Sequence, residues 1–199
     1  MSLQLFADDV IFLQRFLKCG ALYTGKVDGI WGRKTDAAVA AFEAQSERIA
    51  DRHGRFDAAS ERHIRTLQPK AQEAARIFLA KVLTSGITAR VLSGTRTYGE
   101  QNALFRRGRF GNPPPQVTKA RGGQSNHNFG IAWDIGIFEN GAYRGSSTKY
   151  RKAAQVGLAP ALEWGGNWVS FRDEPHYQLA TGCPIAVVRS NFESGLPYL

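Results

Sequence analysis

Four side chains in the second half of the chain have the chemistry of a catalytic metal site. His127 and Asp134 lie close together in sequence, and Asp173 and His176 follow further along the chain. Two imidazoles and a carboxylate are ligands that hold catalytic zinc while leaving one position open for water. Asp173, three residues before His176, would then be placed to accept a proton from that water. This combination predicts a hydrolase.

The spacing of these residues indicates which elements must position them. His127 and Asp134 are seven residues apart, too far for two ligands one turn apart on a helix. We expect a loop histidine followed by an aspartate on an adjoining strand, with Gly130 allowing the backbone to turn between them. His176 would lie on a neighbouring strand of the same sheet. A lone histidine is more often a surface or hydrogen-bonded core residue, but a carboxylate flanked by apolar residues on a strand needs a partner, and a metal is one.

Composition is that of an ordinary globular protein. The chain has 199 residues, 43% hydrophobic and 22% charged, enough for one or two domains with real cores. Its longest apolar runs are too short to span a bilayer. The first residues carry no basic region and no small-residue cleavage site, so we expect synthesis in the cytoplasm and export by a route other than a secretory signal. Cys19 and Cys183 are expected to be two separate buried thiols rather than a disulfide.

Positive charge is concentrated in the second part of the chain. Residues 1–66 hold 10 Lys/Arg against 9 Asp/Glu, whereas residues 67–199 hold 16 against 8, which together give the net charge of +9. A basic surface suits nucleic acid, an anionic wall polymer or membrane headgroups, and charge alone does not choose among them. The arginines are scattered and no nucleic-acid motif is present, so no specific nucleic-acid partner is predicted.

Hydrophobic periodicity and turn residues predict an α+β fold. Helices are expected over residues 5–18, 36–48, 58–67, 70–85, 98–107 and 147–162. Strands are expected over residues 89–94, 131–138, around 143 and 176–179. Thr35 would cap the second helix, and Pro69 would begin the fourth. A domain boundary is predicted near residue 66, which gives a helical domain at 1–66 and a larger domain at 67–199.

The first helices and the glycine-rich loop between them resemble the small three-helix peptidoglycan-binding domain. The matching pattern is Leu13-Gln14…Leu17…Gly20…Gly25-x-Val27-Asp28-Gly29-x-x-Gly32-x-x-Thr35-x-x-Ala38-Val39-x-x-Phe42. The resemblance implies wall binding, with Asp28, Gly29 and Trp31 as contact candidates. It departs at Glu43, where the family usually has Gln. A generic helical hairpin with a permissive glycine turn is the alternative.

The larger domain resembles the zinc peptidoglycan peptidases, which comprise D,D-carboxypeptidases and L-alanyl-D-glutamate endopeptidases. The pattern runs Ser93-Gly94-Thr95-Arg96-Thr97…Gln101, then Ser125-x-His127-x-x-Gly130-x-Ala132-x-Asp134, then Glu163-x-Gly165-Gly166-x-Trp168-x-x-Phe171-x-Asp173-x-x-His176. The resemblance implies a central antiparallel sheet flanked by helices. By the same resemblance, His127, Asp134 and His176 are the Zn²⁺ ligands and Asp173 is the general base.

Further roles follow from the same resemblance. Arg96 would polarise the scissile carbonyl and hold the developing oxyanion, while Ser125 and Gln101 are candidate substrate contacts. An aspartate at position 173, where the D,D-dipeptidase branch has Glu, favours the endopeptidase branch, and Glu174 is the nearest rival base. Position 95 departs from the family, because Thr stands where Tyr or His is common. Three aromatic residues are expected to pack beneath the site, with lining of the substrate groove by one of them as the alternative: Trp164, Trp168 and Phe171.

These patterns predict a zinc endopeptidase that cuts the L-Ala–D-Glu bond of peptidoglycan, acting as a monomeric phage or prophage endolysin released through a holin-type pore. Attraction to an anionic envelope is expected from its charge. A D,D- or L,D-carboxypeptidase is the alternative within the class. A non-catalytic wall-binding protein is the alternative of another class, although all three ligands and the base are present.

Overall fold

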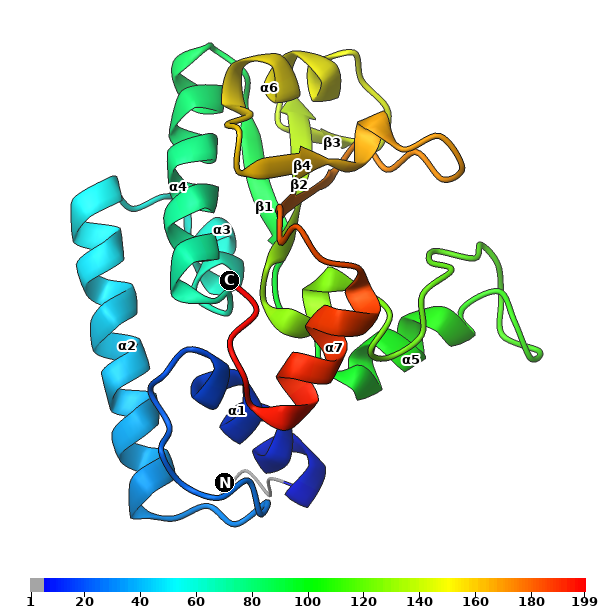
Figure 1. The fold of residues 1–199 in the computed structure, drawn as a ribbon. Coiled ribbons are helices and arrows are strands. Elements are labelled where there is room, and N and C mark those ends of the chain that lie inside the picture. The colour runs from blue at the N-terminus through cyan, green and yellow to red at the C-terminus, as the bar shows by residue number, and fades with distance from the viewer. Residues whose placement is uncertain (1–5) are drawn as a thin grey trace. The chain divides into compact units, whose positions relative to one another are not determined.

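The computed structural model describes residues 6–199, so Leu5 of the first predicted helix lies outside the described part. The chain divides into two compact units, each built from separate stretches of sequence. One unit combines Met1–Gln45, Arg96–Phe129 and Thr181–Leu199, and the other combines Ser46–Thr95 and Gly130–Ala180. Figure 1 gives the element labels. The predicted boundary near residue 66 stays a prediction.

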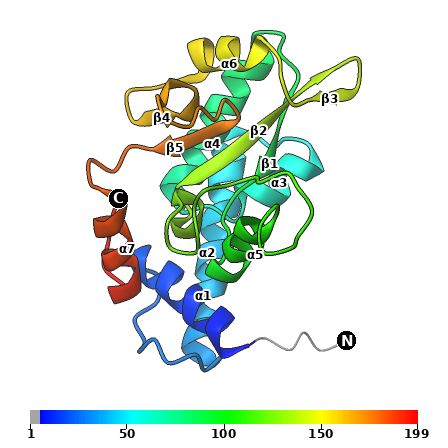
Figure 2. The same ribbon diagram turned by 90° about the vertical axis from the view of Figure 1, so that its right-hand side faces the viewer.

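The unit formed by 46–95 and 130–180 contains an antiparallel sheet. Its strands are β1 (Ala89–Ser93), β2 (Ala132–Glu139), β3 (Ala142–Arg144), β4 (Leu162–Trp164) and β5 (His176–Leu179). The order is β1-β2-β5-β4, with β3 paired to β2 as well. All neighbours are antiparallel, and Figure 2 shows β2 running between β1 and β5. The α+β prediction is therefore confirmed.

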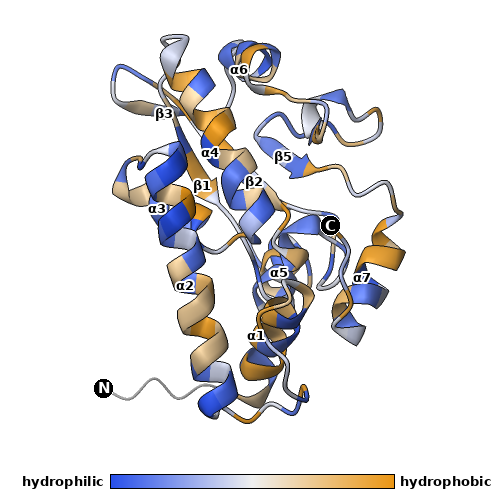
Figure 3. Cartoon of the chain, turned by 60° about the vertical axis from the view of Figure 1, so that its left-hand side comes forward, coloured by the Kyte–Doolittle hydropathy of each residue, from blue (hydrophilic) through white to orange (hydrophobic). Residues whose placement is uncertain are grey.

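Helices α4 (Pro69–Thr84) and α6 (Lys149–Gly157) belong to the same unit as the sheet. Phe78 of α4 is fully buried, with its ring centroid 4.2 Å from that of Tyr177 on β5. A Cβ at Gly157 would lie 2.4 Å from the Phe78 ring, so only glycine lets α6 approach so closely. Figure 3 shows the orange, hydrophobic segments of α4 and β1 that supply this core.

Helix α3 (Ala58–Ile64) is held against the sheet by polar contacts. Asp57 caps it by accepting hydrogen bonds from the backbone N–H groups of Ala59 and Ser60. The Ser60 hydroxyl in turn accepts a hydrogen bond from Val91 N of β1, at 3.0 Å. The helix predicted at 58–67 is thus present but ends at Ile64, and the structure adds that it packs on β1.

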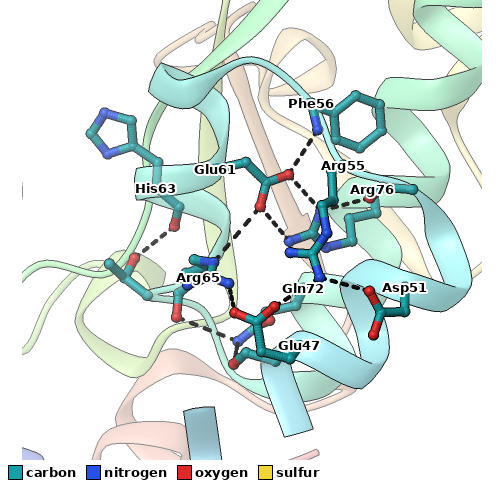
Figure 4. A network of polar contacts seen from close by, with 12 residues as sticks. Glu47, Asp51, Arg55, Phe56, Glu61, His63, Arg65, Gln72 and Arg76 are labelled. Carbon is teal, nitrogen blue, oxygen red and sulfur yellow. Dashed lines mark hydrogen bonds and ion pairs between the residues drawn. The ribbon is translucent and has the colours of Figure 1, made fainter. Parts of the chain in front are cut away.

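Beside α3, a network of charged side chains joins the end of α2 (Arg33–His53) to α3 and α4 (Figure 4). Arg76 is fully buried and donates two hydrogen bonds to Glu61, at 2.7 and 2.8 Å, and one to Gly54 O. Arg55 pairs with Glu47 and Asp51 at the exposed side of the network. Burial alone would raise the pKa of Glu61, but the hydrogen bonds from Arg76 and Phe56 N and the charge of Arg76 outweigh it and lower that pKa.

Replacing Arg76 by leucine is expected to lower the free energy of unfolding by about 3–5 kcal/mol, because the largely buried Glu61 carboxylate would lose both of its hydrogen bonds from Arg76. The exposed Arg55→Gln is the matched control, with an expected cost of about 0–1 kcal/mol. Because the pKa of Glu61 is lowered by folding, its contribution is present above the ordinary value of 4.5 and is lost as the pH falls through the lowered value. Urea denaturation at neutral and acidic pH measures both effects; equal losses in the two variants would contradict the prediction.

The other unit is built from helices. It contains α1 (Ala7–Cys19), the first part of α2, α5 (Tyr98–Arg106), the short 3₁₀ helix η1 (Asn126–Phe129) and α7 (Ile185–Ser194). Phe192 of α7 is fully buried, with ring centroids 5.3 Å from Phe12 of α1 and 5.4 Å from Phe129 of η1. Thr97 caps α5 in a capping box with Glu100. No pattern in the sequence predicted α7.

Several helix boundaries differ from the sequence prediction. Thr35 is no cap, because α2 begins at Arg33 and the Thr35 hydroxyl is buried, accepting a hydrogen bond from Gln14. Helix α6 ends at Gly157 rather than 162, since the chain there turns into β4, which pairs with β5. Cys19 and Cys183 are free thiols, as predicted, but Cys19 is half-buried and Cys183 is exposed, so the prediction that both are buried is wrong. Among residues 6–199, no helix has the length and apolar character that crossing a bilayer requires.

Candidate metal centre

Two of the predicted ligands face each other across neighbouring strands. Asp134 of β2 and His176 of β5 are paired residues in the antiparallel register. Their side chains meet, with His176 Nδ1 3.2 Å from Asp134 Oδ1. The adjoining backbone is tied by a hydrogen bond from Ile135 N to Pro175 O, at 3.0 Å. The sheet itself therefore sets the separation of these two side chains.

His127 lies in η1, directly before the turn into β2. Gly130 makes that turn with φ of +67°, a value that favours glycine. The His127 side chain is buried, and its carbonyl accepts a hydrogen bond from Arg96 N at 3.0 Å. His127, Asp134 and His176 each offer one ligand atom, and these atoms lie within 4.8 Å of one another. The structure thus brings the three predicted ligands together.

The donor set fits zinc. Zinc–nitrogen and zinc–oxygen bonds of about 2.0–2.2 Å place the donors of one tetrahedral ion roughly 3.3–3.6 Å apart. The 3.2 Å between His176 Nδ1 and Asp134 Oδ1 is close to that separation. Burial would lower the pKa of His176, but the hydrogen bond and charge of Asp134 outweigh it and raise that pKa. Asp134 therefore favours a positive charge at this position, which a bound divalent cation would also supply.

Behind His176, two polar side chains fix the orientation of its ring. His176 Nε2 lies 3.0 Å from Gln178 Oε1, and Gln178 Nε2 donates to Glu163 Oε2 at 2.6 Å. An amide oxygen accepts only from a protonated nitrogen, so Nε2 carries a proton, and Nδ1 is the ring nitrogen that faces Asp134 and would serve as the donor atom to a metal. Metal-binding histidines are commonly held by such an outer hydrogen bond. The sequence analysis missed Gln178, although side chains two residues apart on a strand share one face.

Replacing Gln178 by leucine is expected to weaken zinc binding about 10–100-fold, because the outer acceptor that holds the His176 ring is lost. Glu163→Gln keeps an acceptor for the Gln178 amide and should bind zinc nearly as the wild type does. Titration of the metal-free proteins in competition with a chromogenic chelator measures both affinities. Unchanged affinity in Gln178→Leu would contradict the orienting role.

Asp173 is held in a tight turn immediately before His176. Its carbonyl accepts a hydrogen bond from His176 N at 3.2 Å, and its N–H donates to Gly165 O at 3.0 Å. A Cβ at Gly165 would lie 2.5 Å from Asp173 O and 3.1 Å from His176 Cβ. Only glycine at position 165 therefore permits this turn, which keeps Asp173 close enough for its charge to act on His176.

Arg96 and Gln101, two further predicted site residues, are joined to each other. Arg96 Nη1 donates to Gln101 Oε1 at 3.3 Å, and Gln101 Nε2 donates to Thr118 Oγ1 and Ala120 O. Gln101 is fully buried and its amide bridges Arg96 to the 118–120 segment. These contacts indicate that Gln101 positions Arg96. Ser125 accepts a backbone hydrogen bond from Asn128 N within η1. Direct substrate contacts by Gln101 and Ser125 stay predictions.

Comparison with known proteins assigns the chain to a family. The family described as D-alanyl-D-alanine carboxypeptidase matches residues 118–179, and the putative peptidoglycan binding domain matches residues 7–47. The peptidoglycan L-alanyl-D-glutamate endopeptidase CwlK of Bacillus subtilis (strain 168) is 30% identical over 125 residues, which cover 57% of this chain and 73% of CwlK. The chain therefore belongs to the peptidoglycan peptidase family that includes CwlK. An L-Ala D-Glu endopeptidase of Serratia marcescens, ChiX, is 27% identical, with a TM-score of 0.48 and coverage of 64% of this chain and 90% of ChiX.

In the peptidase, one buried residue that the sequence analysis missed ties three segments together. Asn128 is fully buried, and its Oδ1 accepts from Gly123 N at 2.9 Å. Its Nδ2 donates to Arg96 O, also at 2.9 Å. Asn128 therefore fixes the backbone of Arg96 next to that of His127. No pattern in a single sequence distinguishes such an asparagine from an ordinary loop residue.

The aromatic residues near the candidate centre of the peptidase are buried to different degrees. Trp164 is buried and its ring is stacked near Tyr177, as predicted. Trp168 is half-buried, with its ring centroid 4.9 Å from that of His176. Phe171 is 42% exposed, so the prediction that it packs beneath the site is wrong. Its neighbours Val169, Ser170 and Arg172 are exposed as well, so this part of the loop lies at the surface.

In the peptidoglycan-binding domain, the predicted contact loop is organised by a buried glutamine. Gln14 of α1 accepts hydrogen bonds from Asp28 N and Gly29 N and donates to Asp28 Oδ1. Hydrogen bonds from Ile30 N and from Gln14 lower the pKa of Asp28. Trp31 is 41% exposed and donates to Asp36. Asp28 and Gly29 thus shape the loop that presents Trp31, and wall contact by these residues stays a prediction.

Proposed function

We propose that the protein is a zinc-dependent endopeptidase that cleaves the L-Ala–D-Glu bond of the peptidoglycan stem peptide. The observation that carries this proposal is the clustering of His127, Asp134 and His176 with Asp173 in the adjoining turn. Support for the bond comes from the aspartate at position 173 and from the activity named for CwlK. A wall-binding domain on the same chain supports peptidoglycan as the substrate.

The chain's own residues divide the work of peptide hydrolysis. Zinc, when bound, would lower the pKa of a bound water toward neutrality and polarise the peptide carbonyl. Asp173 would take the proton of the attacking water and pass it to the leaving amine. Arg96, positioned by Gln101, would hold the negative charge that develops on the carbonyl oxygen. Trp168, beside the His176 ring, would limit access of bulk water.

Mass spectrometry of digested peptidoglycan tests the reaction. The wild-type protein should release fragments with a new N-terminal D-Glu, and its zinc content should be close to one ion per chain. His127→Ala should release none and should have lost the metal. Free D-Ala in place of the new D-Glu terminus would identify the carboxypeptidase alternative, and fragments equally abundant with His127→Ala would refute metal-dependent hydrolysis.

We also propose that the enzyme serves as an endolysin, made in the cytoplasm, released through a holin-type pore and active as a monomer. The basic charge and the wall-binding domain support action on an anionic cell envelope. Expression in a bacterial host with and without a separate holin tests this setting. Lysis that needs the holin supports the proposal; lysis without it, or no lysis despite cleavage of purified wall, contradicts it. Size-exclusion chromatography with light scattering checks the monomeric state.

A further inference from the structure

The loop that follows α5 carries a concentration of positive charge that the proposed reaction does not use. Residues 106–121, called the basic loop here, contain five basic residues and no acidic one. They are Arg106, Arg107, Arg109, Lys119 and Arg121. No aspartate or glutamate occurs between Glu100 and Asp134. In Figure 1 the basic loop is the long green loop that follows α5.

The basic loop also exposes apolar side chains. Phe110 is 77% exposed and Val117 is 43% exposed. Phe110 has φ of +53°, in the left-handed region that a bulky aromatic residue rarely adopts. Such an unfavourable backbone conformation persists only where surrounding structure enforces it, and it tends to mark functional positions. The exposure of Phe110 is thus a feature of an ordered backbone.

That ordered frame is visible in the hydrogen bonds of the loop. Gly108 N donates to Pro113 O at 2.9 Å, and Gln116 Nε2 donates to Gly108 O at 3.3 Å. Arg109 Nη1 bridges to the carbonyls of Phe105 and Thr118, at 2.7 and 3.0 Å. Arg109 therefore braces the loop. Arg106 and Arg107, by contrast, are exposed and flank the end of α5 from which the loop departs.

We propose that the basic loop docks on an anionic lipid surface. Phe110 and Val117 would enter the boundary between headgroups and acyl chains, while Arg106 and Arg107 would meet the lipid phosphates. Peripheral membrane binding combines these two contributions, apolar side chains in the interface and basic side chains at the phosphates. This inference does not rest on the proposed peptide cleavage, because the residues concerned take no part in it.

The apolar tip decides between lipid and other polyanions. A soluble wall polymer would pair with the arginines and leave Phe110 and Val117 without a role. Single-stranded nucleic acid stacks its bases on several aromatic side chains along a groove. The tip of the basic loop instead carries one aromatic residue together with Val117 and the prolines 113–115. This combination fits the lipid interface better.

Co-sedimentation of the full chain with vesicles tests the proposal. Wild-type protein should bind phosphatidylcholine vesicles that contain phosphatidylglycerol much more strongly than pure phosphatidylcholine. Phe110→Ser should weaken that binding about tenfold, and the double variant Arg106→Gln/Arg107→Gln should weaken it by about tenfold or more. Val169→Ser, an exposed apolar residue elsewhere, and Arg151→Gln/Lys152→Gln, an exposed basic pair on α6, are the matched controls and should bind like the wild type.

Each other outcome overturns the proposal. Wild-type binding by Phe110→Ser would mean that charge alone acts and that the partner is a soluble polyanion. An equal loss in Arg151→Gln/Lys152→Gln would trace binding to net charge rather than to the basic loop. Displacement from the vesicles by an equimolar amount of single-stranded DNA would identify nucleic acid as the preferred partner. Cleavage of a soluble stem peptide, unchanged in all variants, shows that each one is folded and separates this test from that of the proposed reaction.

Discussion

Replacing His176 by alanine is expected to remove bound zinc and to abolish peptidoglycan cleavage. His176 Nδ1 meets Asp134 Oδ1 at 3.2 Å, so the substitution removes one donor of the candidate site and leaves the carboxylate facing a cavity. In zinc-finger peptides four protein ligands together contribute about 10–16 kcal/mol, or about 3 kcal/mol each, so the loss of one of the three ligands here should lower zinc affinity by at least about 100-fold. Turnover should fall by about 10³-fold or more, because metal polarisation of carbonyl and water is lost together.

Asp134→Asn is also expected to lose zinc and peptidoglycan cleavage. Because asparagine has almost the same shape as aspartate, this variant separates loss of the metal from loss of the fold. His53→Ala, a histidine on α2 that pairs with Glu73, is the matched control and should keep both zinc and activity. Inductively coupled plasma mass spectrometry and release of wall fragments measure the two properties. Full activity of Asp134→Asn without bound metal would contradict a metal-dependent reaction.

Asp173→Asn is expected to keep zinc while losing about 10²–10⁴-fold in turnover, the usual range for removal of a general base. The amide cannot accept the proton of the attacking water, whereas the ligand atoms of the candidate site are untouched. Its backbone contacts to Gly165 and His176 do not depend on the side chain, so the turn should survive.

The neighbouring carboxylate supplies the control for this variant. Glu174→Gln changes the same charge one residue away and should retain most of the activity if Asp173 is the base. A large loss in Glu174→Gln with little loss in Asp173→Asn would exchange their roles. Equal and modest losses in both would show that the negative charge of the turn matters rather than proton transfer by one residue.

Much of the sheet and of the candidate site was predictable because its signals are local or paired in short motifs. Strands β1, β2, β3 and β5 follow their alternating or apolar segments, and Gly130 marks the turn between His127 and Asp134. Side chains alternate between the two faces of a sheet along each strand. Once β2 and β5 are paired in the correct register, Asp134 and His176 therefore lie opposite each other on the same face.

What the sequence did not reveal depends on contacts between distant segments. β4 exists because it pairs with β5, and α7 is buried through Phe192 against Phe12 and Phe129. The Thr35 error has the same origin, because a buried hydrogen bond from Gln14 gives that threonine a tertiary role in place of a cap. Gln178 is the exception, since its place two residues after His176 on one strand was a usable signal.

In the proposed zinc enzyme, the direct pairing of Asp134 with His176 would make metal content a measure of how β2 and β5 are aligned. A slip of one residue between β2 and β5 would carry one partner to the opposite face of the sheet, and a chain misassembled in this way would hold no ion at the predicted position. Because the ion would bind only chains with the correct register, its binding would stabilise that register relative to the misaligned forms. In a refolded or heterologously produced sample, the fraction of chains that bind zinc should equal the fraction in which β2 and β5 are paired in the native register.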